Sequence, residues 1–347
     1  MRRASAFTAL ALTATVLGLA VPGTAAADPA GPTDYRSEIV QISPDPGTIE
    51  VSIAGGDSFV VIEVAAGTEV VVLGYQGEHY LRITSDGQVW ENRRSPATYE
   101  NTERYGVGEL PPEADADADA EPEWRRVGSG GSWAWHDHRA HRMDPFPPVN
   151  VERGEQVLDT VVPLLVDGTE VDVRVSSTWM AAPSAVPSMV GLFLGVALVG
   201  VVGVLRRRPA AALAVAATSA LVIGVVQFRS LHPATDPLWL WWLAPAIGLV
   251  AAATAIVLEV RSPSLPGRAN LAALGAVAVA ALQLVVWGIE RRHGHWRAVL
   301  PTDAPFWLDR LVSAATLAAG IAVLLVVVVN VAAALRAPGR APARSRG

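Results

Sequence analysis

Hydrophobic and polar positions follow one pattern in the first half of the chain and another in the second. Between residues 35 and 92, short runs rich in Val, Ile, Thr and aromatic residues are separated by turn sequences such as Pro-Asp-Pro-Gly and Ser-Asp-Gly. Runs of this kind between turn signals predict β-strands. The predicted strands are 35–43, 48–55, 58–65, 68–75, 79–84 and 88–92.

Two further predicted strands, 156–166 and 169–180, flank Asp167-Gly168, a dipeptide that favours a hairpin turn. Regular short strands with turn signals predict an all-β domain, an immunoglobulin-like sandwich, over residues 28–185. Residues 92–150 are predicted to form an irregular insertion. Its acidic run EADADADAE is interpreted as a solvated loop, with calcium binding as an alternative that its spacing does not favour.

After residue 185 the pattern changes to long apolar stretches. Each is long enough to cross a hydrocarbon core of about 30 Å at about 1.5 Å per helical residue. The five predicted membrane-spanning helices are 186–205, 209–228, 238–258, 271–289 and 311–335. Gly191 and Gly195 form a small-residue pair that favours close approach of another helix. The predicted stretches have no ionisable residue in their interior, so solute transport is the least favoured function class.

Arg2 and Arg3, the apolar run that follows them and Ala25-Ala26-Ala27 together predict a signal peptide over residues 1–27. Arginines follow the first helix, separate the third from the fourth, and fill the tail at 336–347. Since positive residues stay in the cytoplasm, this pattern predicts a cytoplasmic tail and an extracytoplasmic domain. The expected location is the cytoplasmic membrane of a bacterium, with the lipid bilayer as a partner.

The composition of the 347-residue chain excludes several kinds of site and disfavours others. Cysteine is absent, which excludes disulfides, thiolate metal sites and cysteine nucleophiles. A net charge of −6 and the lack of a long basic patch argue against nucleic-acid binding. No nucleophile elbow, phosphate loop or zinc-protease motif is present. A triad assembled from scattered residues such as Ser132 stays possible, but the prediction is a protein that is not an enzyme.

The chain's candidate chemistry lies in GSWAWHDHRAHRMDP, residues 131–145, which holds three of the seven histidines. His136 and His138 are two apart, so in a strand both rings would point to one face. His141 would close the site from a turn. Imidazole nitrogens suit copper and zinc, which makes these residues a candidate metal site with an unspecified cofactor, Cu or Zn. Weaker candidates are Met143 or Asp137 as a fourth ligand, and His293 with His295 as a second site.

The same segment also supports a structural interpretation. Trp133 and Trp135 alternate with the histidines and would pack an aromatic face onto the sheet. Asp137 and Arg139 would then make charge-assisted hydrogen bonds that hold an irregular loop. The spacing matches no standard zinc signature. The favoured function is thus a membrane-tethered binding or interaction module, and the alternative is a structural or docking protein with an envelope protein as its partner.

Three stretches carry a resemblance to a known family: LGYQGEHYLRI, NRRSPATYENTERYG and WRRVGSGGSWAWHDHRAHRM. Together with the hairpin and five apolar helices that follow, they resemble a family of actinobacterial exported membrane proteins with a Trp-x-Trp-His-Asp-His-Arg-x-His segment. The resemblance covers nearly all of the chain after the signal peptide. It implies an envelope location and the same architecture, but no particular activity.

Overall fold

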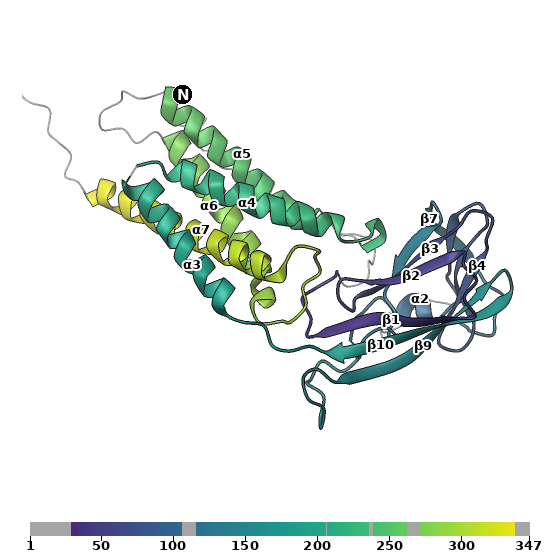
Figure 1. The fold of residues 1–347 in the computed structure, drawn as a ribbon. Coiled ribbons are helices and arrows are strands. Elements are labelled where there is room, and N and C mark those ends of the chain that lie inside the picture. Colours follow the sequence, from purple (N-terminus) through teal and green to yellow (C-terminus); the bar gives the residue numbers. More distant parts are fainter. Residues whose placement is uncertain (1–28, 106–115, 206, 236–238, 262–270, 337–347) are drawn as a thin grey trace, which may run out of the picture. The chain divides into compact units, whose positions relative to one another are not determined.

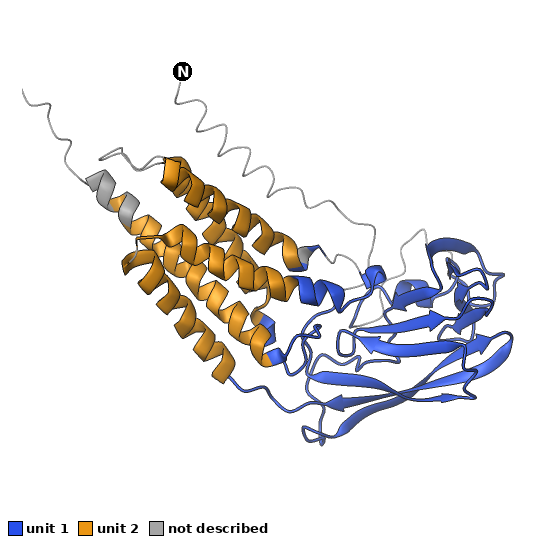
Figure 2. Ribbon diagram, turned by 45° about the horizontal axis from the view of Figure 1, so that its top comes forward, with its two compact units in different colours: residues 1–185, 225–241, 293–306 blue, residues 186–224, 242–292, 307–347 orange. Residues whose placement is uncertain are grey.

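The computed structural model describes residues 29–105, 116–205, 207–235, 239–261 and 271–336. It divides into two compact units (Figure 2). Unit 1 holds the chain up to residue 185 together with the segments 225–241 and 293–306, and unit 2 holds the remaining helical residues. The predicted signal peptide and almost all of the predicted tail lie outside the described residues.

Unit 1 contains two antiparallel sheets and a short helix (Figure 1). One sheet has seven strands in the order β1-β10-β9-β4-β5-β6-β7, and the other has three in the order β2-β3-β8. The strands are β1 Tyr35–Ser43, β2 Ile49–Ala54, β3 Phe59–Val64, β4 Val70–Leu73, β5 His79–Ile83, β6 Gln88–Asn92, β7 Trp124–Ser129, β8 Ser132–Trp135, β9 Gln156–Val166 and β10 Thr169–Trp179; the helix is α2 Ala97–Glu100.

The two sheets share one hydrophobic core. Val60 and Ile62 of β3 and Trp135 of β8 pack with residues of the large sheet such as Leu81 and Val173. Alternate residues of a strand face opposite sides, which explains why these positions point into the core together. The predicted all-β sandwich is confirmed, with a division of seven and three strands that is less even than the four and three of a constant immunoglobulin domain.

The small sheet is covered on its other face as well. Phe59 of β3 and Ala134 of β8 belong to a second apolar cluster with Ala30 and Leu231. Leu231 lies in the segment 225–241, which is part of unit 1. The first four residues of β3, Phe59 to Ile62, are therefore buried or half-buried on both faces, and this explains why all four are apolar.

The prediction of an irregular insertion over residues 92–150 was wrong in part. Two strands lie inside it: β7 pairs with β6, and β8 pairs with β3. The sequence of β7 is mostly polar because the strand lies at the edge of the large sheet and exposes much of its length. In the acidic run, the described residues 116–121 form a turn in which the Asp117 amide donates to the Arg94 carbonyl at 2.8 Å.

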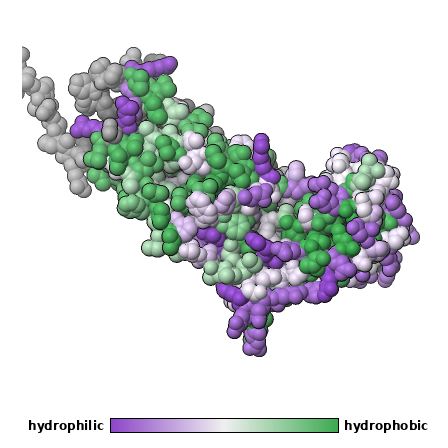
Figure 3. Space-filling view, in the orientation of Figure 1, coloured by the Kyte–Doolittle hydropathy of each residue, from purple (hydrophilic) through white to green (hydrophobic). Residues whose placement is uncertain are grey.

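All five predicted apolar stretches are helices. They are α3 Val186–Leu198, which continues as a π-helix over Val199–Leu205, then α4 Pro209–Arg229, α5 Leu240–Arg261, α6 Leu271–Glu290 and α7 Phe306–Arg336. Short 3-10 turns occur at Pro233–Thr235 and Arg292–His295. Each of the five spans is long and apolar enough to cross a membrane, and apolar surface covers these helices in Figure 3. The chain is a multi-pass membrane protein.

In unit 2, the predicted glycine pair has a packing partner, and the last helix starts earlier than its apolar pattern predicts. Gly191 and Gly195 are buried against α7, where an added Cβ would overlap the carbonyl oxygens of Leu311 and Ala315. The fifth helix begins at Phe306, five residues before the predicted start. Its first turns hold Asp309, which pairs with Arg291. Since the two charges compensate each other, both side chains are buried, and an apolar pattern alone could not locate this start.

Candidate metal centre

The three clustered histidines lie in a turn that follows β8. The strand ends one residue before His136, and the Ala140 amide donates to the Asp137 carbonyl at 2.9 Å to close the turn. The prediction that a strand aligns His136 and His138 was therefore wrong in its geometry. A turn can reverse the chain over a few residues, so it also brings His141 back to the other two rings.

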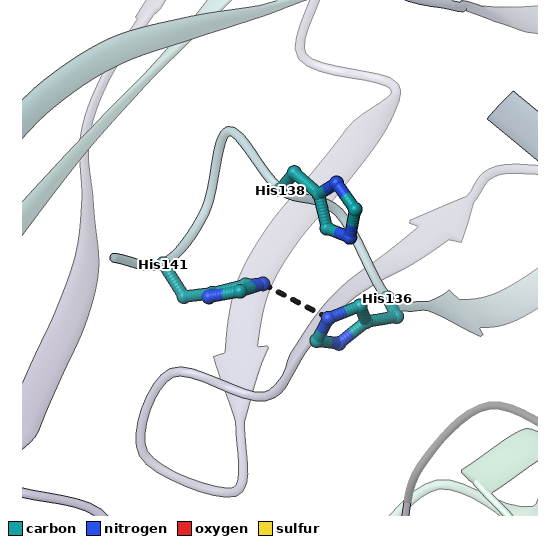
Figure 4. A group of neighbouring side chains, drawn as sticks. All are labelled: His136, His138 and His141. Carbon is teal, nitrogen blue, oxygen red and sulfur yellow. Dashed lines mark hydrogen bonds between the residues drawn. The ribbon is translucent and has the colours of Figure 1, made fainter. Parts of the chain in front are cut away.

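The three rings converge on one place (Figure 4). One ring nitrogen from each of His136, His138 and His141 lies within 4.8 Å of the others. Among the described residues, this is the one group of three or more His, Asp or Glu side chains with such closely spaced ligand atoms. His136 and His141 are 3% and 0% exposed, whereas His138 is half-buried.

His136 is held by a strand that is distant in sequence. Its Nδ1 lies 2.7 Å from the carbonyl oxygen of Ser58. A carbonyl only accepts hydrogen bonds, so Nδ1 carries the hydrogen. The Phe59 ring meets the imidazole edge-on at 6.0 Å. Burial lowers the pKa of His136 to about 4, so the ring is neutral at pH 7 and its Nε2 has a lone pair.

His141 has the same arrangement with a different partner. Its Nδ1 lies 3.0 Å from the carbonyl oxygen of Arg142, so Nδ1 again donates. Burial is the main cause that lowers the pKa of His141 to about 2, and the neighbouring His136 contributes. This ring is also neutral at pH 7, and its lone pair is also on Nε2.

The two lone pairs face each other. The Nε2 atoms of His136 and His141 lie 2.9 Å apart, which is hydrogen-bond distance, but neither atom carries a hydrogen when both rings are neutral. Such a contact is repulsive unless a cation joins the two nitrogens. A tetrahedral ion at about 2.0–2.1 Å from each nitrogen would hold them about 3.3 Å apart. A small movement of either ring would therefore create two ligand positions.

His138 is the most accessible of the three. Its Nε2 donates to the carbonyl oxygen of Glu103 at 2.8 Å, and its amide donates to the Tyr75 hydroxyl at 2.9 Å. Its ring stacks on that of Tyr75 at 5.9 Å. Since Nε2 carries the hydrogen, the lone pair of a neutral His138 is on Nδ1.

Asp137 does not serve as a fourth ligand in this arrangement. It is fully buried and accepts hydrogen bonds from Trp135 Nε1 at 3.0 Å and from Arg139 Nε at 2.9 Å. Burial alone would raise the pKa of Asp137, but the hydrogen bonds and charge of Arg139 lower it. Arg139 also donates to the Leu73 carbonyl at 3.0 Å. The predicted charge-assisted hydrogen bonds between Asp137 and Arg139 are thus present, and they hold the turn.

The second pair of candidate histidines, His293 and His295, is not part of this group. His293 is exposed and His295 is half-buried, and both lie in the short turn after α6. The His293 ring meets Trp296 at 5.4 Å. Neither histidine belongs to a cluster of three potential ligands among the described residues. Met143 is half-buried two positions after His141, and its role as a ligand stays a prediction.

Sequence reasoning missed the role of His232. Its Nδ1 accepts from the Ala234 amide at 3.0 Å, so its Nε2 carries the hydrogen and donates to Ser132 Oγ at 3.0 Å. Ser132 opens β8, the strand that leads to His136. No local pattern could reveal this bond, since its partners are 100 residues apart.

No protein-family model, curated protein or solved structure matches this chain. The function is therefore argued from the geometry of the histidine group.

Proposed function

We propose that this chain is a membrane-anchored binding module of the bacterial cell envelope, and that its β domain holds one copper or zinc ion through His136, His138 and His141. The observation that carries the proposal is the pair of Nε2 lone pairs 2.9 Å apart on two buried neutral rings. A buried polar atom without a partner is costly. A metal ion removes the repulsion and gives both nitrogens a partner.

Hydrogen bonds already fix the rings for this task. Metal-bound histidines in proteins donate their other ring N–H to a carbonyl or carboxylate, which sets the tautomer. His136 and His141 make such bonds to Ser58 and Arg142. The Asp137–Arg139 pair holds the turn between them. The two ligands are therefore preorganised before an ion arrives.

The proposed location rests on the arginine pattern. Positive segments after the first helix, between the third and fourth, and in the tail favour the cytoplasm, which puts the β domain outside. The β domain forms one unit with the segments between α4 and α5 and between α6 and α7, and these segments fall on the outer side in the same scheme. The resemblance to exported actinobacterial membrane proteins supports the same location.

The second candidate function is a structural or partner-docking module without metal. The hydrogen bonds of Asp137 and Arg139 favour it, because they stabilise the segment without any ion. The two candidates differ in what the histidines contribute. If the histidines are metal ligands, a protein in which they are replaced loses the metal and keeps its fold. If they are structural, the same replacement lowers the stability of the protein.

Calorimetric titration of the full-length protein in detergent tests the proposal. The full chain is needed because the segments 225–241 and 293–306 belong to unit 1. We expect one Zn²⁺ or Cu²⁺ per chain, and no uptake by a folded variant with His136→Ala, His138→Ala and His141→Ala. The control is His79→Ala, at an exposed histidine of β5. No uptake by the native protein, with an early-melting triple variant, would support the structural candidate instead.

A further inference from the structure

The histidine group is packed against the segment that follows α4. The His136 ring meets the Phe59 ring edge-on at 6.0 Å, and Ala134 lies two residues before His136. Phe59 and Ala134 belong to one apolar cluster with Leu231, and the three side chains are 2%, 3% and 5% exposed. Leu231 is the second residue after α4, which ends at Arg229. One buried cluster therefore lies between a proposed metal ligand and the end of a membrane-spanning helix.

A hydrogen bond joins the same two elements. Ser132, which opens β8, accepts at 3.0 Å from Nε2 of His232, the residue after Leu231. The His232 ring also meets the Trp133 ring edge-on at 6.5 Å. His232 holds its own turn as well, because its Nδ1 accepts from the Ala234 amide at 3.0 Å. The strand that leads to the histidine group and the turn after α4 are therefore joined by apolar packing and by a hydrogen bond.

An ion in the histidine group requires this packing to change. The Nε2 atoms of His136 and His141 lie 2.9 Å apart, and a tetrahedral ion would hold them about 3.3 Å apart. Neither ring can move into solvent, because the two residues are 3% and 0% exposed. The Nδ1 of His136 is bonded to the carbonyl of Ser58, the residue before Phe59. Protein interiors are close-packed, so a displacement of His136 acts on Phe59 and on the cluster that contains Leu231.

Helix α4 continues from this cluster into the membrane-spanning unit. Its last residues, from Val225 on, belong to the unit of the β domain, and its preceding residues, from Pro209 on, belong to unit 2. Arg207 and Arg208 come directly before Pro209, and the arginine pattern favours the cytoplasm for this end of the helix. Shifts of about 1–2 Å in packed helices are enough for allosteric transitions. A displacement at Leu231 therefore has a continuous helix along which it can reach the cytoplasmic side.

We propose that this protein is a transmembrane metal sensor, in which occupancy of the histidine group is coupled to the turn 230–235 and through it to α4. The inference rests on the proposed function and adds to it what the bound ion does. Such coupling is reciprocal: if the ion displaces the turn, a change in the turn must alter the affinity for the ion. Since the packed cluster opposes the displacement of His136, removal of the Leu231 side chain should raise that affinity.

The Zn²⁺ affinity of the full-length protein in detergent tests this reciprocity. The affinity is measured by competition with a chromogenic chelator. The test variant is Leu231→Ala, which leaves the three candidate ligands in place. The matched control is Leu300→Ala, at a buried leucine of the segment 293–306. Leu300 is in the same unit, but it belongs neither to the sandwich core nor to the cluster of Leu231.

We expect the Zn²⁺ affinity of the Leu231→Ala variant to rise by about fivefold, which is the lower end of allosteric couplings, and that of the control to stay unchanged. An unchanged or lowered affinity in the Leu231→Ala variant would overturn the coupling, because Leu231 would then only stabilise the fold. If the native protein takes up no Zn²⁺, the proposed function itself fails.

A second measurement uses the native protein alone and does not depend on how a variant folds. The amides of Ala234 and Thr235 donate to the His232 ring and carbonyl at 3.0 and 2.9 Å, so their hydrogen exchange reports on the turn after α4. We expect Zn²⁺ to change the exchange rate of these two amides and not that of the Val299 amide, which donates to the Thr33 carbonyl at 2.8 Å. Equal rates with and without bound Zn²⁺, or an equal change at Val299, would overturn the coupling, and the metal site would stand without it.

Discussion

The carboxylate of Asp34 accepts a 2.9 Å hydrogen bond from the guanidinium of Arg297, which lies 263 residues later in the segment between α6 and α7. Its other oxygen accepts from the Ala298 amide at 3.0 Å. Next to this contact, Thr33 and Val299 exchange backbone hydrogen bonds of 3.0 and 2.8 Å as an antiparallel bridge. The start of the β domain and a segment between two apolar helices are therefore parts of one unit.

This bridge predicts an engineered disulfide. Residues that exchange both backbone hydrogen bonds in an antiparallel pair have Cα atoms about 5.5 Å apart, within the range of disulfide bonds. A variant with Thr33→Cys and Val299→Cys should form the bond without competition, since the chain has no cysteine. We expect a reductant-sensitive shift in gel mobility. Each single variant is the control, and free thiols in the double variant under oxidising conditions would contradict the bridge.

The proposed orientation predicts which of two engineered cysteines is accessible from outside the cell. Val149 of the β domain is 82% exposed, and Arg261 ends α5 and is exposed. In intact cells, a membrane-impermeant maleimide should label Val149→Cys and leave Arg261→Cys unlabelled. Both should react after the membrane is opened. Labelling of Arg261→Cys alone in intact cells would reverse the orientation.

The lowered pKa values of His136 and His141 predict a loss of stability in acid. Both folded-state pKa values, about 4 and about 2, lie below the unfolded value of about 6.5, so the unfolded chain takes up protons first. The stabilisation of the neutral rings is complete above pH 6.5 and is lost as the pH falls. At pH 5 the cost is about 2 kcal/mol per histidine.

Melting of the metal-free protein, followed by tryptophan fluorescence between pH 7 and 5, checks this dependence. The melting temperature should fall more steeply in the native protein than in a variant with His136→Asn and His141→Asn. The control His79→Ala should follow the native curve. Parallel curves for the native protein and the double variant would show that these rings do not titrate as expected.

The Asp137–Arg139 pair predicts a large effect on stability. Replacing Asp137 by Asn leaves the buried guanidinium, whose side chain is 16% exposed, without its counter-charge. Breaking such a pair costs about 3–5 kcal/mol. Asp159→Asn breaks an exposed pair with Arg174 and should cost far less, because solvent screens the two charges. Chemical unfolding of the two variants beside the native protein measures both, and similar values would show that burial does not set the cost.

The close contact at Gly195 predicts that even one methyl group disturbs the helices. An added Cβ would overlap the backbone of Ala315 in α7, which cannot move independently of its helix. Gly195→Ala should therefore destabilise unit 2 by about 1–3 kcal/mol. Gly275→Ala in α6 is the matched control, because among the described residues no atom of another helix lies within 4 Å of its added Cβ. Thermal unfolding in detergent should separate the two variants, and equal melting temperatures would contradict the packing.

Much of the architecture followed from local pattern. The predicted strands 35–43 and 156–166 match β1 and β9 residue for residue, and the first predicted helix matches the span 186–205. Strand and helix periods are properties of a few neighbouring residues, so a sequence reveals them directly. The strands β7 and β8 were not predicted, because they are short and lie beside glycines. Their pairing with β6 and β3 stabilises them, and that pairing is not visible in a local pattern.

By itself, the sequence determined most of the strands, the five long helices and the residue types of the candidate site. The spacing of His136, His138 and His141 in one short segment was enough to predict that their rings would meet. Only the tertiary structure decided what the rings can do there. The tautomers depend on a carbonyl at Ser58 and a carbonyl at Glu103, 78 and 35 residues away from their histidines. Hydrogen-bond partners and buried charges from distant segments are set by packing, and no local pattern encodes them.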